Sequence, residues 1–341
     1  MNALPAVLRL ALAGWLLTAL PAVATAQPEF DEAIALFQSG KYAAAAAIAR
    51  KLAASGHREA QAMMGVLRQN GHGLPKDPRA AAQWFRKAAK AGHVGGMFAL
   101  AMLHLSGALG EKNPREALKW ARMAAQRGHV GAQYNVGLLY AGAHGLKPDY
   151  HAAARWFRRA AEAGYAAAQY NLAVLYATGR GVERNYSQAA KWFRRAALGG
   201  LPQAAVEYGV LVFRGEGVVK NEKIGAQWLQ YAAQSGNADA MRKLARLYAA
   251  GRGVNRRPVL AAKWYLLAKK RGARDTWLDL FMRHLPAVKI RQARRLAAAF
   301  RPTRMRRYDT RPARAARVLR MNGKGDIMRK PPRRRPGPAQ R

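Results

Sequence analysis

The 341-residue chain contains no cysteine. This absence excludes disulfide bonds, thiolate metal sites, a cysteine nucleophile and a lipidated N-terminal cysteine. Acidic residues are scarce as well, because 18 Asp and Glu stand against 59 Lys and Arg, which gives a net charge of +41. Half of the residues are hydrophobic, so the chain has enough apolar side chains for a folded core, and wholesale disorder is excluded.

Long apolar runs are also missing, apart from one at the N-terminus. Arg9 is the only charge in residues 1–26, an apolar run follows it, and Ala24-Thr25-Ala26 fits the small-x-small cleavage rule. This pattern predicts a signal peptide of residues 1–26 and a mature chain that begins at Gln27. An uncleaved anchor in the inner membrane is the alternative, although the run is shorter than the roughly 20 residues of a standard spanning helix. In either case we expect export, and the lack of cysteine fits a periplasmic or secreted protein of a bacterium.

A period of 36 residues dominates the middle of the chain. Three sets of equivalent residues, which we call columns, recur at intervals of 36 residues. One consists of tryptophans, one of glycines and one of small residues, and each has six members. They are Trp84, Trp120, Trp156, Trp192, Trp228 and Trp264; Gly92, Gly128, Gly164, Gly200, Gly236 and Gly272; and Gly65, Ala101, Gly137, Ala173, Gly209 and Ala245. A period of 20 to 50 residues is typical of stacked supersecondary units.

Each unit is predicted to be a pair of helices. In the unit 131–164, apolar residues at helical spacing predict a first helix over 132–140, and glycines at 142–145 end it. Asp149 is placed to cap a second helix, which ends before Gly164. The Trp column is expected in the core and the small column where two helices approach closely. The pattern therefore predicts an all-α fold, a right-handed α/α superhelical solenoid of stacked helix pairs. The expected capping column is Asp77, Asn113, Asp149, Asn185 and Asn221, with Arg257 as a departure.

The repeat resembles the Sel-one-like repeat (SLR) family, a relative of the tetratricopeptide repeat. The stretch from Asn171 to Asn185, followed by Ala189, Trp192 and Gly200, matches the family pattern closely. The resemblance covers about residues 29–272, with a shortened first unit at 29–56. It implies an exported bacterial protein that acts as an adaptor in multiprotein or envelope-associated assemblies.

Four segments follow from these patterns. They are a signal peptide at 1–26, a solenoid at 27–272 with about six full repeats and the shortened unit, two capping helices at 273–300, and a basic tail at 301–341. The tail is rich in Arg and Pro, and its composition predicts an extended, disordered segment.

No catalytic or metal-binding constellation is visible. His57, His93 and His129 also keep the 36-residue step. Equivalent positions in stacked helix pairs lie about 10 Å apart, which is too far for ligands that must sit about 2 Å from one zinc ion. Because no nucleophile, phosphate-loop or metalloprotease motif appears either, we predict no catalytic residue, no metal and no cofactor. An envelope hydrolase is the least favoured of three functional hypotheses.

The favoured hypothesis is a non-enzymatic scaffold that binds a protein or peptide in a groove lined by the first helix of each pair. Aromatic rings, amides and charged groups at non-core positions of these helices suit peptide recognition, whereas the alternative is an ordinary polar helix face. The candidate groove residues are Tyr134, Asn135, Tyr170, Asn171, Glu207, Arg242, Lys243 and Arg246.

The third hypothesis is a binder of anionic polysaccharide or cell-wall polymer through the basic surface itself. Residues 27–300 hold 43 Lys and Arg and 16 Asp and Glu, a net charge of +27 before the tail is counted. Anionic lipid, lipopolysaccharide and wall polymer are the expected anionic partners. The alternative is that the positive charge reflects the base composition of the genome and has no binding role. Nucleic acid is not expected in vivo, because export removes access to it and no nucleic-acid motif appears.

Overall fold

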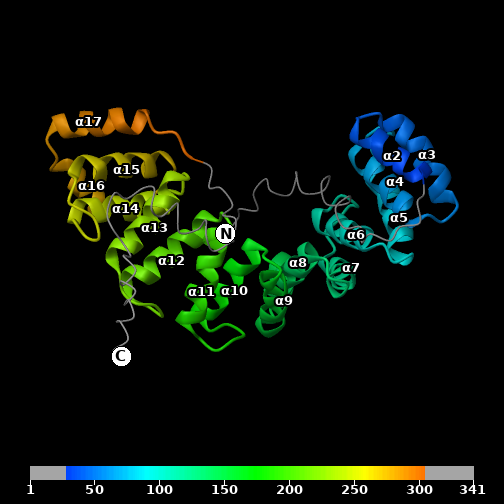
Figure 1. The fold of residues 1–341 in the computed structure, drawn as a ribbon, viewed down its shortest axis with the longest axis horizontal. Helices are drawn as coiled ribbons and strands as arrows, with labels where there is room; N and C mark the ends of the chain where they lie inside the picture. Colours follow the sequence, from blue (N-terminus) through cyan, green and yellow to red (C-terminus); the bar gives the residue numbers. More distant parts are fainter. Residues whose placement is uncertain (1–27, 304–341) are drawn as a thin grey trace, which may run out of the picture.

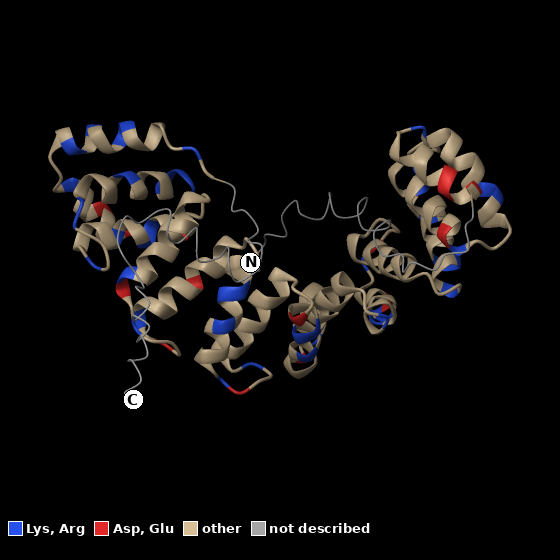
Figure 2. Ribbon diagram, viewed as in Figure 1, with Lys and Arg blue, Asp and Glu red and all other residues tan. Residues whose placement is uncertain are grey.

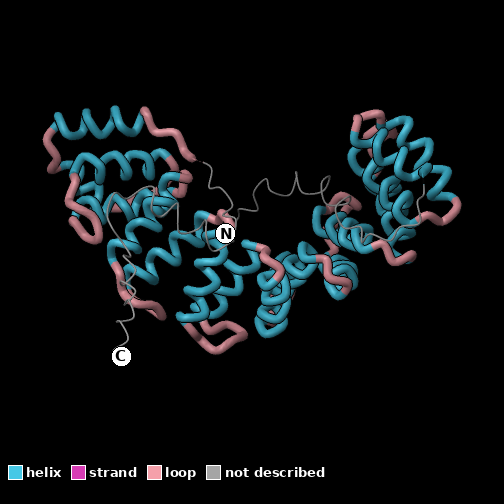
Figure 3. Tube along the Cα trace, in the orientation of Figure 1, coloured by secondary structure: helices cyan, strands magenta, loops and turns pink. Residues whose placement is uncertain are grey.

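A computed structural model describes residues 28–303. This part of the chain contains sixteen α-helices, one short 3-10 helix and no strand, which confirms the all-α solenoid of helix pairs. The helices follow one another along a curved array and are joined by short loops (Figures 1 and 3). The signal peptide and all of the tail beyond Thr303 lie outside the described residues, so those two predictions stay predictions.

Six helix pairs make up the array. Their first helices are α4 (Arg58–Asn70), α6 (Val94–Ser106), α8 (Val130–Tyr140), α10 (Ala166–Thr178), α12 (Pro202–Arg214) and α14 (Ala238–Ala250). Their second helices are α5 (Pro78–Lys90), α7 (Pro114–Gln126), α9 (Tyr150–Glu162), α11 (Tyr186–Leu198), α13 (Glu222–Gln234) and α15 (Pro258–Lys270). A further pair, α2 (Pro28–Gln38) and α3 (Tyr42–Ala54), precedes them, and the 3-10 turn η2 (Ala143–Gly145) lies between α8 and α9. Each α-helix from α2 to α14 packs against the next one in the chain. No helix in this part is long and apolar enough to cross a bilayer.

The second helices begin at the capping column that the sequence predicts. The side chain of each of its five members accepts a hydrogen bond from a backbone N–H in the first turn of its helix, as Asp149 does from Ala152 at 2.9 Å. Arg257 caps nothing with its side chain. The glycine column ends the second helices in the left-handed conformation that glycine adopts without a Cβ penalty, with φ of 87° at Gly164.

The column of small residues sets the distance between the two helices of a pair. A Cβ built on Gly137 would lie 2.5 Å from the ring of Phe157, so only glycine leaves room for that ring. In the following unit Ala173 occupies the same column and is fully buried. The close approach that the sequence predicts is therefore present, and its tightness depends on the partner ring.

The tryptophan column is only partly a core column, which corrects the sequence analysis. Trp192, Trp228 and Trp264 are buried, but Trp84, Trp120 and Trp156 are half-buried. In two of the N-terminal units the next residue is the one at the centre of the core, since Phe85 and Phe157 are 0% and 2% exposed. The indole rings of these units lie at the edge of the core, whereas Trp192 and Phe193 are both buried, at 6% and 3% exposed.

Two further helices follow the last helix pair. They are α16 (Thr276–Arg283) and α17 (Ala287–Ala298), and α17 packs along α15. Leu278 and Ala293 are fully buried, whereas Trp277 is 46% exposed. After α17 the chain turns back, and the backbone N–H of Thr303 donates to the carbonyl of Gln234 at the end of α13.

Candidate functional site

The eight groove candidates come from equivalent turns of four successive first helices, α8, α10, α12 and α14. We call this set the first-helix ladder: Tyr134, Asn135, Tyr170, Asn171, Glu207, Arg242, Lys243 and Arg246. Seven of them are half-buried and Arg246 is exposed. Between units, Tyr134 interacts with Asn171, and the charges of Glu207 and Lys243 act on their neighbours in the adjacent units.

The N-terminal part of the ladder is aromatic. The ring of Tyr134 packs against Tyr165 with centroids 4.9 Å apart, and the side chain of Asn171 in the next unit interacts with its hydroxyl. Burial, together with Tyr165, raises the pKa of Tyr134 above its usual value. Asn135 takes little part in this chain of contacts, because its amide donates to the carbonyl of Gly131 in its own helix at 2.8 Å.

A half-buried carboxylate occupies the middle of the ladder. Tyr170 packs edge-on against Phe193 with centroids 5.5 Å apart, and burial and the charge of Glu207 raise the pKa of the Tyr170 hydroxyl. Burial also raises the pKa of Glu207, and the neighbouring Asp239 acts in the same direction while Lys243 opposes it. Glu207 therefore links the aromatic part of the ladder to the charged part.

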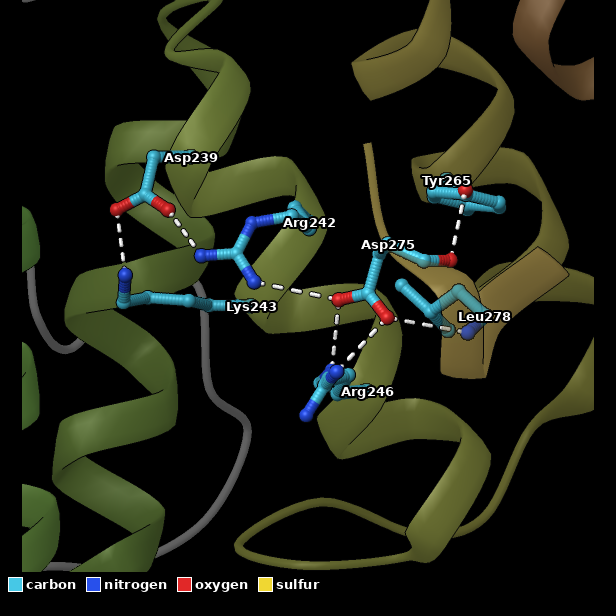
Figure 4. Close-up of polar contacts among 7 residues, drawn as sticks. All are labelled: Asp239, Arg242, Lys243, Arg246, Tyr265, Asp275 and Leu278. Atoms are coloured by element: carbon cyan, nitrogen blue, oxygen red, sulfur yellow. Dashed lines mark hydrogen bonds and ion pairs between the residues drawn. The ribbon is translucent and has the colours of Figure 1, made fainter. Parts of the chain in front are cut away.

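The C-terminal part of the ladder is a network of ion pairs (Figure 4). Asp239 accepts from Lys243 and Arg242 at 2.6 Å each, and Arg242 also donates to Asp275 at 3.2 Å. Arg246 holds the same Asp275 with two bonds of 2.7 and 2.8 Å. These cations were predicted to take part in peptide recognition, and in the structure they pair with carboxylates of the chain itself.

Asp275 is the residue that the sequence analysis missed. Its side chain is 1% exposed and also caps α16 by accepting from the N–H of Leu278 at 3.1 Å, while its carbonyl accepts from the Tyr265 hydroxyl at 3.0 Å (Figure 4). Burial raises the pKa of Asp275, but the bonds from Arg246, Leu278 and Arg242 outweigh this effect and hold it below its usual value. Two signals point to it: an acid directly before an apolar helix, and a 36-residue step from Asp239.

The three periodic histidines are helix caps. Nδ1 of His57, His93 and His129 accepts from the backbone N–H three residues on, at 3.1, 2.9 and 3.0 Å. This role requires an unprotonated Nδ1, and burial lowers the pKa of both His93 and His129. Within residues 28–303 no group of three or more His, Asp or Glu side chains is placed to hold a metal ion.

Consecutive helix pairs, each packed against the next, define a repeat protein of the solenoid class. The sequence model of the Sel1 repeat matches six consecutive segments, 58–93, 94–129, 130–165, 166–201, 202–237 and 238–272. The chain therefore belongs to the Sel1 repeat family.

Solved structures agree with this assignment. A protective antigen present in uropathogenic Escherichia coli strains, which displays an SLR fold, is 26% identical with a TM-score of 0.69, over 89% of this chain and 65% of the antigen. The chain thus spans just under two thirds of that relative. A Sel1 repeat protein from Oxalobacter formigenes is 28% identical with a TM-score of 0.61, over 72% of this chain and 99% of that protein. No curated protein matches. Sel1 repeat proteins are generally scaffolds for protein–protein interaction and are typically not enzymes.

Proposed function

We propose that this protein is a non-enzymatic scaffold of the bacterial cell envelope that binds a protein or peptide along its first-helix ladder. The observation that carries the proposal is the continuity of the ladder. Aromatic, amide, carboxylate and cationic side chains follow one another across α8, α10, α12 and α14, and all of them except Arg246 are half-buried. Such a mixture suits an extended peptide, which offers both backbone polar groups and side chains.

An exposed tryptophan at the C-terminal end of the ladder supports the same proposal. Trp277 is 46% exposed and stacks on Phe281 with centroids 5.9 Å apart, and the Arg246 guanidinium lies 5.7 Å from its ring. A large exposed indole beside a fixed cation is typical of an interface anchor. A bound peptide would therefore meet its apolar anchor next to the ion-pair network.

Affinity capture from envelope extract tests the ladder. The baits are the unaltered chain, an Asn171→Ala/Glu207→Gln variant in the ladder, and a control variant, Gln203→Ala/Glu162→Gln, at exposed positions outside it. We expect a discrete protein that the unaltered chain and the control retain and the ladder variant loses. Equal retention by all three baits would refute the assignment of the ladder.

The place in the envelope rests on the N-terminal sequence and on the positive charge. We propose that residues 1–26 direct export and are removed, and that the basic tail of 301–341 holds the protein close to anionic surfaces. Mass spectrometry of the protein from a fractionated bacterial host should find an N-terminus at Gln27 in the periplasm or the medium. A chain that keeps Met1 and stays in the cytoplasm would contradict this part of the proposal.

A further inference from the structure

Four of the loops that join the two helices of a pair also pack on the pair before them. In each of these loops a glycine lies against the backbone of the first residue of the preceding second helix. A Cβ built on Gly73 would lie 2.5 Å from backbone atoms of Tyr42 and Ala43, so only glycine allows this approach. We call the four contacts the loop clasps: Gly73 on α3, Gly181 on α9, Gly217 on α11 and Gly253 on α13.

Side chains reinforce each loop clasp. The ring of His72, which precedes Gly73, stacks on Tyr42 with centroids 4.3 Å apart. The other three clasps have a cation over a ring, a hydroxyl bond and an ion pair: Arg180 lies 5.6 Å from the Tyr150 ring centroid, Ser187 donates to the Gly217 carbonyl at 2.9 Å, and Arg252 pairs with Glu222. Each of these junctions therefore has a contact of fixed direction besides its apolar packing.

The junction at α5 has no loop clasp. Leu109 occupies the position of the clasp glycine in the loop between α6 and α7, and α5 begins with Pro78 where the clasped helices have Tyr or Glu. Because a Cβ at this position would collide with the helix backbone, the leucine loop cannot approach α5 as the glycine loops approach their helices. Leu109 packs instead against the apolar cluster that contains Ala81 and Leu103. Such a contact is attractive but has no preferred direction.

The junction at α7 lacks a clasp for a different reason. Ala143 stands where the equivalent Gly179 ends its helix in the left-handed conformation, which alanine disfavours. Gly142 adopts that conformation instead, with φ of 92°, and α8 has 11 residues where α10 has 13. The loop then follows another path. A Cβ built on Gly145, the equivalent of Gly181, would have no atom within 4 Å apart from its chain neighbours, so the loop does not pack on α7 there.

Ion pairs do not join the unit 94–129 to its neighbours either. Among residues 28–303, the one ion pair of this unit, Lys119 with Glu116, lies within α7, where Figure 2 shows acidic and basic segments on the same helix. The core is divided in the same part of the array, because buried side chains from Ala153 to Leu278 form one continuous cluster and those before Ala153 form four separate clusters. The two junctions without a clasp thus lie where the packing is least continuous.

We propose that the helix pair of α6 and α7 is a double hinge, about which the N-terminal arm, α2 to α5, changes its position relative to α8–α17. In Figure 1 this pair lies between the arm and the rest of the array. Apolar contacts hold the junction on each side of it together and allow small rotations, and two successive rotations add up over the length of the arm. The hinge is separate from the scaffold function, because the first-helix ladder begins at α8 and keeps its shape when the arm moves.

Pairs of spin labels measure this motion in the full chain, which has no cysteine of its own. The hinge pair, Gln83→Cys/Arg155→Cys, spans the two junctions without a loop clasp. The matched control pair, Arg155→Cys/Gln227→Cys, spans two junctions that each have one. The three positions are exposed and equivalent in α5, α9 and α13, and both pairs are two units apart. Double electron–electron resonance then gives the distribution of distances within each pair.

We expect the distance distribution of the hinge pair to be at least about twofold wider than that of the control pair. Gly181→Leu, which copies Leu109, should widen the distribution of the control pair, whereas Glu183→Leu, at an exposed position of the same loop, should not. Circular dichroism checks that all variants are equally helical. Equal widths of the two pairs without any further substitution would overturn the hinge, and an unchanged width with Gly181→Leu would overturn the role of the loop clasps.

Discussion

Replacing Asp275 by asparagine should loosen the C-terminal end of the array. The side chain is 1% exposed and receives charge-assisted bonds from Arg242 at 3.2 Å and from Arg246 at 2.7 and 2.8 Å. Asparagine preserves the helix cap and the shape but removes the charge. Breaking a buried ion pair costs about 3–5 kcal/mol when the remaining charge is stranded.

The expected cost here is lower because neither arginine is stranded. Arg242 keeps its bond to Asp239, and the side chain of Arg246 is 49% exposed to water. We therefore expect Asp275→Asn to lower the free energy of unfolding by about 2–3 kcal/mol. Asp275→Ala should cost about 1 kcal/mol more, because the bond to the N–H of Leu278 is lost too.

Urea denaturation followed by circular dichroism and by tryptophan fluorescence measures the effect, and hydrogen exchange locates it in α14 and α16. Because the folded-state pKa of Asp275 is lowered, the stabilisation is complete above the ordinary value near 3.8 and is lost as pH falls through the folded-state pKa. The difference between the two proteins should disappear at that low pH. Asp279→Asn, which removes an exposed partner of Lys269, is the control and should change much less. A change below about 0.5 kcal/mol for Asp275→Asn, the level of an ordinary surface substitution, would refute the reasoning.

Two further predictions concern the repeat columns. Because burial lowers the pKa of His93 and His129 in the folded chain, the unfolded chain takes up protons first, so stability should decline as pH falls below about 6.5 and level off below the folded-state values. Replacing both by asparagine, which caps without titrating, should flatten urea stability between pH 7 and pH 5, and an unchanged slope would contradict the capping role. Gly137→Ala should cost about 1–3 kcal/mol in urea denaturation through the clash with Phe157. Adding Phe157→Leu should recover part of the loss, and a harmless Gly137→Ala would show that the ring moves freely.

Periodicity explains why the fold could be predicted from the sequence. Each unit packs mainly against its neighbours, so the repeated columns of Trp, Gly and capping residues describe the same local packing in unit after unit. The helix pairs and their caps follow from those columns. The burial of the tryptophans does not, because the same Trp column is half-buried in three units and buried in the other three.

The candidate site was predictable in position but not in its interactions. The spacing places Tyr134, Tyr170 and Arg242 on equivalent turns of successive helices. It does not reveal that Asp275, which belongs to the closing helices, reaches back to α14 and pairs with Arg242. This contact joins residues 33 apart, and the spacing of equivalent residues does not show which side chains meet between one unit and the next.

The return of the chain after α17 ties its last described residues to a unit that lies well before the C-terminal end of the array. The bond from Thr303 to Gln234 joins residues 69 apart, and a Cβ built on Gly236 would lie 3.6 Å from Pro302. In an array of stacked units, a terminal unit can open locally while the others stay folded. Here the contact spans α14 to α17, so the closing helices cannot separate from the array without breaking it. The end of the array is thereby coupled to its fifth unit, and we expect the two to lose protection from hydrogen exchange together.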